Sequence, residues 1–290
     1  MMYYPVAHNS PEWFECRRGM PTSSCFGQII NPETAMKDLA KVQGAMDIQN
    51  GVKSIEEVAK ELSVTENTVK GYVKKFGLET ELPEPDLLAG AETYAHLLLA
   101  EIIEGTSLDK FPQTYWMERG AMMEEEAARL YEFETGYKVD RGGFITDDEM
   151  KAGCSPDRRV LDKDGNVIGA LEIKCPAPWT HVENLLKKEI DKQYNPQVQG
   201  QMAVGEFQFV DWFSYHPNMP PSLITTKRDE PYIDILKLGI NKFDKMMKDK
   251  AKQLVEIGAL PEMPTKVMPE IKDGVQDLID GKTGEILMAG

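Results

Sequence analysis

Two carboxylates and a lysine lie close together between residues 154 and 176. The alternation of residues 167–174 predicts a β-strand that directs Glu172 and Lys174 to the same face. Asp157 begins the preceding segment and is expected across from them in a hairpin. Two carboxylates and an ammonium group converging at a hairpin can hold a divalent cation and position a water.

The turn of this hairpin is predicted at Asp164 and Gly165. That dipeptide suits a type I′ turn, which needs a positive φ at both central residues. An isolated E-x-K is more often an exposed charge pair on a solvated sheet. The preceding Ser155-Pro156-Asp157, at hairpin spacing, favours instead the D-…-E-x-K core of a metal-dependent nuclease.

A helix is predicted at about residues 115–135. Its apolar stripe steps by four and three through Met117, Ala121, Ala128 and Tyr131, and Glu124 lies on the same stripe. A carboxylate on a buried face is costly unless it is paired, protonated or on a metal. Glu124 is therefore a candidate third acidic group, and the alternative is a glutamate near a helix end that reaches solvent.

After the hairpin, Asn195 and Pro196 predict the start of another helix. Tyr194, Gln197 and Gln201 fall on one stripe of it, where amides could bond a nucleic-acid backbone or the attacking water. Glutamines on an exposed helix would give the same pattern.

Residues 11–24 contain Arg17 and end in hydroxyl residues that include Ser24. A guanidinium group and hydroxyls suit a phosphate group, although an N-terminal loop and helix start would look the same.

Residues 32–85 are predicted to be an insert. Ser54 and Thr65 are expected N-caps, and Glu57 completes a capping box. The two short helices resemble a helix-turn-helix, whose second helix offers Lys70, Lys74 and Lys75 to DNA phosphates. A helical hairpin used only for packing or partner contact is an equal alternative.

The rest of the chain predicts a helix at residues 86–105, strands at 207–215 and 232–236, and a long helix at 238–257. Residues 261–290 form an expected acidic tail, with a small hairpin near Gly281 and Lys282.

Composition restricts the classes of protein to consider. The 290 residues allow one large core plus a small module. No apolar run is long enough for a membrane helix, the start lacks the features of a signal peptide, and the four cysteines suit free thiols in a reducing cytoplasm. A net charge of −15 disfavours non-specific binding to nucleic acid, so any DNA site must group its basic residues in one place.

Several blocks in this order resemble the phage-type alkaline exonucleases, the λ exonuclease and YqaJ-like recombinase family of the PD-(D/E)xK superfamily. The blocks are Trp13, Arg17, Gly19, Thr22 and Ser24; residues 94–101; Gly120, Glu124 and residues 130–136; residues 154–157; residues 172–176; and residues 194–199. The resemblance implies an α/β (α+β) restriction-endonuclease-like core with a central mixed β-sheet flanked by helices. Residues 1–31 and 86–260 would form that core, around the insert.

The resemblance also implies site residues. Asp157, Glu172 and the Ile173 carbonyl would hold Mg²⁺, with Glu124 reaching a second ion, and Mn²⁺ could substitute. Lys174 would orient or deprotonate the attacking water, assisted by Gln197. A pocket for the 5′-phosphate would be formed by Arg17, Ser24 and Ser155, with Tyr194 as a further DNA contact.

By the same resemblance, the protein would digest one strand of linear duplex DNA from 5′ to 3′ and leave a 3′ overhang for phage-type recombination. It would act as a ring-shaped homotrimer beside a single-strand annealing protein, in a bacterial or phage-infected cytoplasm. One alternative is an endonuclease or structure-specific nuclease of the same fold. Another is a non-catalytic DNA-binding protein led by the helix-turn-helix.

Overall fold

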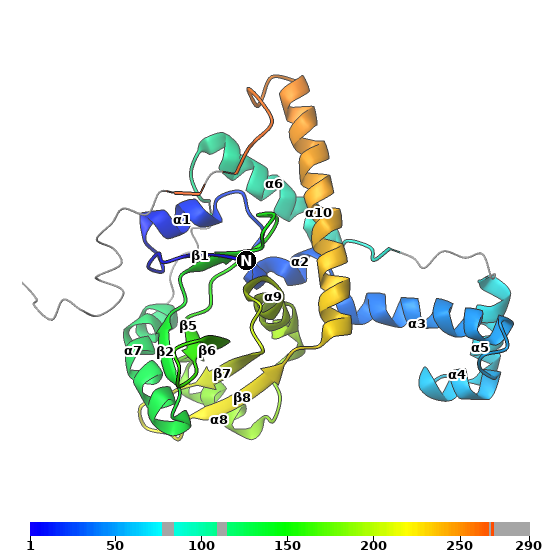
Figure 1. Cartoon of the computed structure of the whole chain (residues 1–290), viewed down its shortest axis with the longest axis horizontal. Helices are drawn as coiled ribbons and strands as arrows, with labels where there is room; N and C mark the ends of the chain where they lie inside the picture. Colours follow the sequence, from blue (N-terminus) through cyan, green and yellow to red (C-terminus); the bar gives the residue numbers. More distant parts are fainter. Residues whose placement is uncertain (77–83, 109–114, 267, 270–290) are drawn as a thin grey trace, which may run out of the picture.

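The computed structural model describes residues 1–76, 84–108, 115–266 and 268–269. Its centre is a mixed sheet in the order β2-β5-β6-β7-β8 with helices on both faces (Figure 1). β6 and β7 run parallel, and the other neighbouring pairs run antiparallel. The strands are β2 (Lys138–Arg141), β5 (Arg158–Leu161), β6 (Val167–Lys174), β7 (Phe209–Ser214) and β8 (Ser222–Lys227). The expected α/β fold with a central mixed sheet is confirmed.

The two faces of β6 meet different helices. Leu171 and Ile173 pack with Phe213 against α7 (Tyr115–Thr135), whose Ala128 and Tyr131 are buried as expected. The opposite face packs against α6 (Ala89–Glu104), α9 (Asn195–Gly205) and α10 (Glu230–Glu256). Because side chains alternate along a strand, Glu172 and Lys174 lie on the α9 side.

The remaining small elements lie around this core. A three-stranded sheet has the order β1-β3-β4, from β1 (Met2–Tyr4), β3 (Phe144–Thr146) and β4 (Gly153–Cys154). The N-terminal segment adds α1 (Pro11–Arg17), the 3-10 turn η1 (Ser23–Cys25) and α2 (Phe26–Ile29). After β6 come α8 (Pro178–Leu186) and the 3-10 turn η2 (Lys192–Tyr194).

The β5–β6 hairpin forms, but its type I′ turn is wrong. Gly165 has a φ of +85°, whereas Asp164 is not among the residues with positive φ. Asp162 organises a longer loop instead, since its side chain accepts hydrogen bonds from the backbone N–H groups of Asp164 and Asn166, both at 2.9 Å. An acidic residue three positions ahead of the glycine thus decided the turn.

The strand predicted at residues 232–236 is also wrong, because these residues lie in α10. Asp229 caps this helix by accepting from the Tyr232 N–H at 3.1 Å. Ile233, Leu236 and Ile240 then share a buried helical stripe. The last strand of the sheet is instead β8, which was not predicted. Its residues alternate only between half-buried and exposed, so its sequence has a weak strand pattern.

Residues 32–76 form three helices: α3 (Pro32–Gln49), α4 (Ile55–Glu61) and α5 (Glu66–Lys75). The predicted capping box of Ser54 and Glu57 and the Thr65 cap are present. Figure 1 shows that α3 carries α4 and α5 away from the sheet. We call α3, α4 and α5 the helical module. The predicted linker that follows lies partly outside the described residues.

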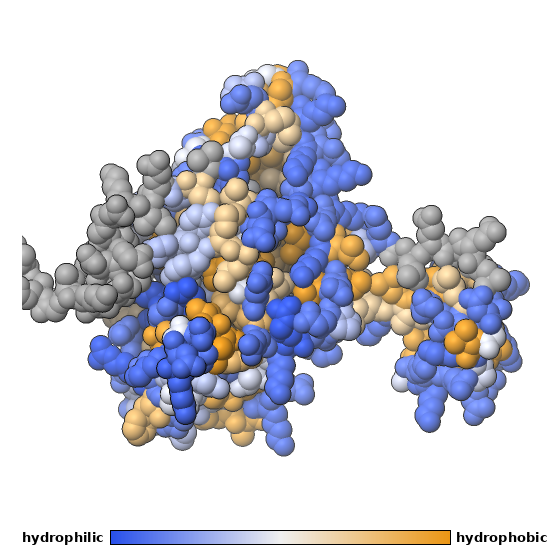
Figure 2. All heavy atoms as spheres, in the orientation of Figure 1, coloured by the Kyte–Doolittle hydropathy of each residue, from blue (hydrophilic) through white to orange (hydrophobic). Residues whose placement is uncertain are grey.

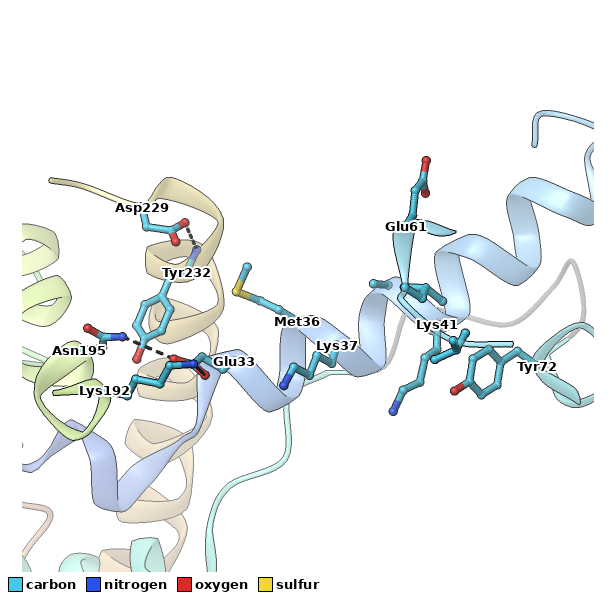
Figure 3. Close-up of a pocket in the computed structure, with 13 residues that line it drawn as sticks. Glu33, Met36, Lys37, Lys41, Glu61, Tyr72, Lys192, Asn195, Asp229 and Tyr232 are labelled. Atoms are coloured by element: carbon cyan, nitrogen blue, oxygen red, sulfur yellow. Dashed lines mark hydrogen bonds and ion pairs between the residues drawn. The ribbon is translucent and has the colours of Figure 1, made fainter. Parts of the chain in front are cut away.

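A cavity of about 630 Å³ separates the helical module from the core (Figure 3). Glu33 of α3 accepts a hydrogen bond from Asn195 at 3.4 Å and lies 3.6 Å from the Lys192 ammonium. The base of α3 is therefore tied to the start of α9. None of the predicted nuclease site residues lines this cavity.

The start of the expected tail packs on the core. Lys266 donates hydrogen bonds to the backbone oxygens of Glu15 and Arg18, at 3.2 and 2.6 Å. The predicted hairpin near Gly281 lies outside the described residues. The four cysteines are free thiols, as expected. Within the described segments, no helix combines the length and apolarity needed to cross a membrane.

Candidate active site

Asp157 lies where the β5–β6 ladder ends. Arg158 pairs with Leu171 in the antiparallel register, so Asp157 comes opposite Glu172 as predicted. Its Oδ2 accepts a hydrogen bond from the Ile173 N–H at 2.7 Å. A side-chain carboxylate thus replaces the missing strand partner, and this bond fixes the carboxylate beside the end of β6.

Glu172 and Lys174 form an ion pair on the α9 side of the sheet. Glu172 is 2% exposed, and its Oε2 lies 2.8 Å from the Lys174 Nζ. The other oxygen, Oε1, accepts a hydrogen bond from Gln201 of α9. The Lys174 ammonium also lies 4.9 Å from the ring centroid of Trp212. The pair is therefore held in place on three sides.

The carboxylates shift the pKa values of the group. Burial, together with the negative charges of Glu172 and Glu124, raises the pKa of Asp157 to about 8. Burial by itself would lower the pKa of Lys174, but the carboxylates of Glu172 and Asp157 outweigh it and raise that pKa. Lys174 is thus a firmly protonated ammonium group in the metal-free protein.

Glu124 meets the site from α7 through an arginine. Its side chain is 29% exposed and forms an ion pair with Arg158, which also bonds the Asp157 carbonyl oxygen at 2.7 Å. Arg158 reaches Glu125 at 3.1 Å as well. Glu124 therefore lies beside the Asp157 loop without joining a tight cluster. Across the described ranges, no three Asp, Glu, His or Cys side chains are grouped closely enough to hold a metal.

The chemistry of these residues nevertheless fits a divalent cation. Oxygen ligands are those that Mg²⁺ prefers, and Asp157 and Glu172 supply them beside the Ile173 backbone. Burial is the main cause of the raised pKa of Asp157, and the charges of Glu172 and Glu124 add to it, so a nearby cation would favour the ionised carboxylate. In addition, the Gln201 Oε1 is buried and has no hydrogen-bond partner among the described residues.

Ser155 joins the N-terminal segment to the loop before Asp157. Its hydroxyl donates to the Gly143 carbonyl at 2.6 Å and accepts from the Trp13 indole N–H at 2.7 Å. The His8 Nε2 lies 2.8 Å from the same oxygen. Because the only hydroxyl proton goes to Gly143, we assign the proton of this third bond to His8. Ser155 could donate to a phosphate only by releasing Gly143.

We expect Ser155→Ala to lower the free energy of unfolding by about 1–3 kcal/mol, since it leaves the two half-buried donors of Trp13 and His8 without this acceptor. Urea denaturation would measure this loss. Ser24→Ala removes an exposed hydroxyl, so it serves as the control and should change stability by less than about 0.5 kcal/mol. Equal stability of the two variants would contradict the structural role of Ser155.

The other predicted phosphate ligands lie near this network. The Arg17 guanidinium lies 4.4 Å from the ring centroid of Trp13, so it stacks on the indole that bonds Ser155. Thr22 forms a bridge with Gly153, which places the exposed Ser24 beside the strand leading to Ser155. Their hydroxyls, Thr22 Oγ1 and Ser24 Oγ, lie 3.2 Å apart.

Tyr194 and Gln197 stand at the start of α9. The Tyr194 ring lies 4.5 Å from that of Trp212, and its hydroxyl contributes to the raised pKa of Lys174. Gln197 is half-buried. The amide that bonds Glu172 is Gln201, one turn later. Gln201 lay on the predicted stripe, but the motif match selected Gln197.

Sequence reasoning missed His8 and Arg158 as members of this site. A single histidine near the N-terminus gave no signal, because its partner Ser155 is far along the chain. Arg158 could have been found from the strand alternation, since it points toward α7 when Asp157 points away. Burial lowers the pKa of His8, and the charges of Glu124 and Glu172 act against that change.

Residues 89–208 match the profile of the YqaJ-like viral recombinase domain. Comparison with curated protein sequences gives no match. Among solved structures, the chain resembles LHK-Exo, an alkaline exonuclease from Laribacter hongkongensis, with a TM-score of 0.58 and 24% identity over 86% of this chain and 98% of that one. Its complex with dAMP gives the same values. A phage-related exonuclease from Haemophilus somnus 129PT is 14% identical over 58% of this chain and 86% of that one, with a TM-score of 0.45.

The matched range contains the carboxylates, Lys174 and both candidate glutamines described above. The resemblance stated from the sequence motifs is thus confirmed by an independent comparison. Residues 89–208 of this chain match the YqaJ-like viral recombinase domain, and the fold is similar to that of the alkaline exonuclease LHK-Exo.

Proposed function

We propose that this protein is a Mg²⁺-dependent 5′→3′ exonuclease that digests one strand of linear duplex DNA and leaves a 3′ overhang for recombination. The observation that carries the proposal is the convergence of Asp157, Glu172 and Lys174 at the end of the hairpin. The viral recombinase domain supports it. So does the solved complex of LHK-Exo with dAMP, a nucleotide of the kind that digestion of DNA releases.

In this proposal Asp157, Glu172 and the Ile173 carbonyl hold Mg²⁺, and Glu124 serves a second ion after exchanging its bond with Arg158. Bound Mg²⁺ would stabilise the negative charge that develops on the phosphodiester. Lys174, protonated beside Glu172, donates hydrogen bonds and cannot accept a proton. We therefore assign it to orienting the attacking water and not to deprotonating it.

Direction would be set by a pocket for the 5′-phosphate. Arg17 supplies a permanent positive charge, and Ser24 supplies an exposed hydroxyl. Ser155 holds Trp13 and His8 at the wall between this pocket and Asp157. Tyr194, whose ring packs at a tilt against Trp212, would contact the DNA beside Lys174.

An end-label assay tests the function. Linear duplex DNA with a 5′-phosphate or a 5′-hydroxyl, and a closed circular control, are incubated with Mg²⁺. We expect loss of the 5′-phosphorylated strand, slower loss of the 5′-hydroxyl strand and intact circles. Cutting of circles would favour an endonuclease, and no cleavage with Mg²⁺ or Mn²⁺ would favour a non-catalytic DNA-binding protein.

Metal binding should depend on pH through Asp157. The pKa of Asp157 is about 8 without metal, so below this pH a cation must displace a proton. We expect the Mg²⁺ concentration that half-saturates thermal stabilisation to rise up to about tenfold per pH unit below 8. Thermal melts at pH 7, 8 and 9 measure it. Asp157→Asn should bind Mg²⁺ weakly at every pH, and a pH dependence retained by Asp157→Asn would exclude this carboxylate as the cause.

We also propose that the enzyme acts as a homotrimeric ring beside a single-strand annealing protein in the cytoplasm. A ring would keep basic residues in its lumen and so reconcile the net charge of −15 with DNA binding. Size-exclusion chromatography with light scattering should give about three times 32.7 kDa. A monomer mass would remove the ring from the proposal.

A further inference from the structure

The helical module has a small core of its own. Val58, Ala59 and Val69 are buried there, surrounded by half-buried side chains of α3, α4 and α5. The turn between α4 and α5 includes Ser63, which has a positive φ of 52°. Gln49 of α3 donates hydrogen bonds to the backbone oxygens of Val73 and Phe76, at 2.9 and 2.8 Å. α5 is therefore held rigidly against α3.

One side of α5 is left outside this core. Asn67, Lys70, Gly71 and Lys74 lie at positions i, i+3, i+4 and i+7 of a single helical stripe, and all four are exposed. We call these four residues the outer face of α5. Thr68 and Lys75 flank it and are exposed as well. Figure 2 shows mostly hydrophilic side chains on the visible side of the module.

Charge is distributed unevenly along the protein. Residues 32–76 contain seven lysines and seven acidic residues, so their net charge is zero in a chain of −15. Residues 67–76 contain three of these lysines and no acidic residue. The last two turns of α5 are therefore a local positive surface on an acidic protein, and such a surface complements phosphates.

Among the described residues, nothing accounts for a glycine at position 71. A glycine inside a helix costs about 1 kcal/mol relative to alanine. At Gly44 of α3 that cost has a cause, because an added Cβ would lie 2.7 Å from a methyl group of Val58. At Gly71 an added Cβ would meet nothing within 4 Å. A glycine between Lys70 and Lys74, with open space above it, suits the close approach of a partner to the helix backbone.

We propose that the outer face of α5 binds the major groove of duplex DNA, as a second DNA site separate from the nuclease site. Lys70, Lys74 and Lys75 contact phosphates, and Gly71 lets the groove wall approach the helix. Asn67, in the first turn, faces the base edges, where an asparagine can bond adenine through two hydrogen bonds. The site goes beyond the proposed nuclease function and needs neither Mg²⁺ nor a free DNA end.

The helical module can hold such a site away from the nuclease site. α3 has 18 residues, which at about 1.5 Å per residue span roughly 27 Å. Figure 1 shows α5 at one end of the long axis of the molecule, with α7, β5 and β6 on the other side of α10. DNA bound at α5 would keep the enzyme near its substrate between encounters with an end.

The test uses a closed DNA dumbbell, which has no ends, in EDTA, with the full-length protein and fluorescence anisotropy. We expect wild type to bind, and the triple variant Lys70→Gln, Lys74→Gln and Lys75→Gln to bind at least about tenfold more weakly. The slope of log affinity against log salt should fall by about 3 in this variant. A matched triple variant on α10, with Lys245, Lys248 and Lys252 changed to glutamine, removes the same charge elsewhere and should bind as wild type.

Gly71→Ala distinguishes a DNA contact from a merely structural helix. Alanine should keep or raise the melting temperature, because it favours the helix and meets no neighbour. We expect it nevertheless to weaken dumbbell binding about tenfold. Wild-type affinity in Gly71→Ala, equal losses in the two triple variants, or no dumbbell binding by wild type would each overturn the proposal.

The outcome does not depend on the nuclease proposal. The difference in dumbbell binding between the two triple variants in EDTA reports α5, and the end-label assay reports cleavage. At saturating linear DNA the α5 variants should cleave at the wild-type rate. If the outer face binds a protein in place of DNA, wild type will fail to bind the dumbbell, which counts against the proposal.

Discussion

Replacing Lys174 with alanine is expected to reduce cleavage of linear duplex DNA by about 10²–10⁴-fold, the usual range for a positioned group that acts on the attacking water. The ammonium lies 2.8 Å from the Glu172 carboxylate. Single-turnover rates at saturating Mg²⁺ measure the chemical step directly.

The expected loss must be separated from misfolding. Lys174→Ala removes the partner of a buried carboxylate, so the melting temperature should be recorded alongside the rate. Lys250→Ala is a matched control, because Lys250 is 21% exposed and lies 2.7 Å from Glu92 on α6, outside the site. A folded Lys174→Ala that cleaves within about tenfold of wild type would exclude the assigned role.

Replacing Glu172 with glutamine is expected to abolish detectable cleavage, a loss of about 10³-fold or more, by removing a metal oxygen ligand at the centre of the site. The effect of this substitution on thermal stability in EDTA has two opposing parts. Glutamine removes the repulsion between Glu172 and Asp157, which partly raises the pKa of Asp157. It also removes the negative charge that pairs with the Lys174 ammonium group.

Metal binding is the readout that isolates this role. We expect the thermal stabilisation by Mg²⁺ seen in wild type to disappear in Glu172→Gln. Glu132→Gln is the control, since Glu132 is a half-buried carboxylate of α7 that accepts from the Val139 N–H at 3.0 Å, away from Asp157. Stabilisation by Mg²⁺ that persists in folded Glu172→Gln would show that the cation binds elsewhere.

Much of the site was predictable from the sequence because its parts are local. The alternation of residues 167–174 decides which side chains share a face, and the hairpin brings Asp157 opposite Glu172. The helical module was predictable for the same reason. Ser54, Glu57 and Thr65 cap helices through hydrogen bonds to residues three positions away.

What the sequence could not decide depends on contacts between distant segments. Tyr232 and its neighbours fit a strand by composition, but their stripe packs on the core as a helix that Asp229 begins. Gln197 and Gln201 lie on one stripe of α9. The packing of α9 against β6 decides that Gln201 is the one that donates a hydrogen bond to Glu172. The position of Glu124 depends on Arg158 from another strand. Ser155 bonds Trp13 and His8 more than 140 residues away. Residues close in the chain therefore account for the chemistry of the hairpin and for the caps of the helical module. The polar partners around each carboxylate depend on the packed fold, because they come from segments that lie far apart in the chain.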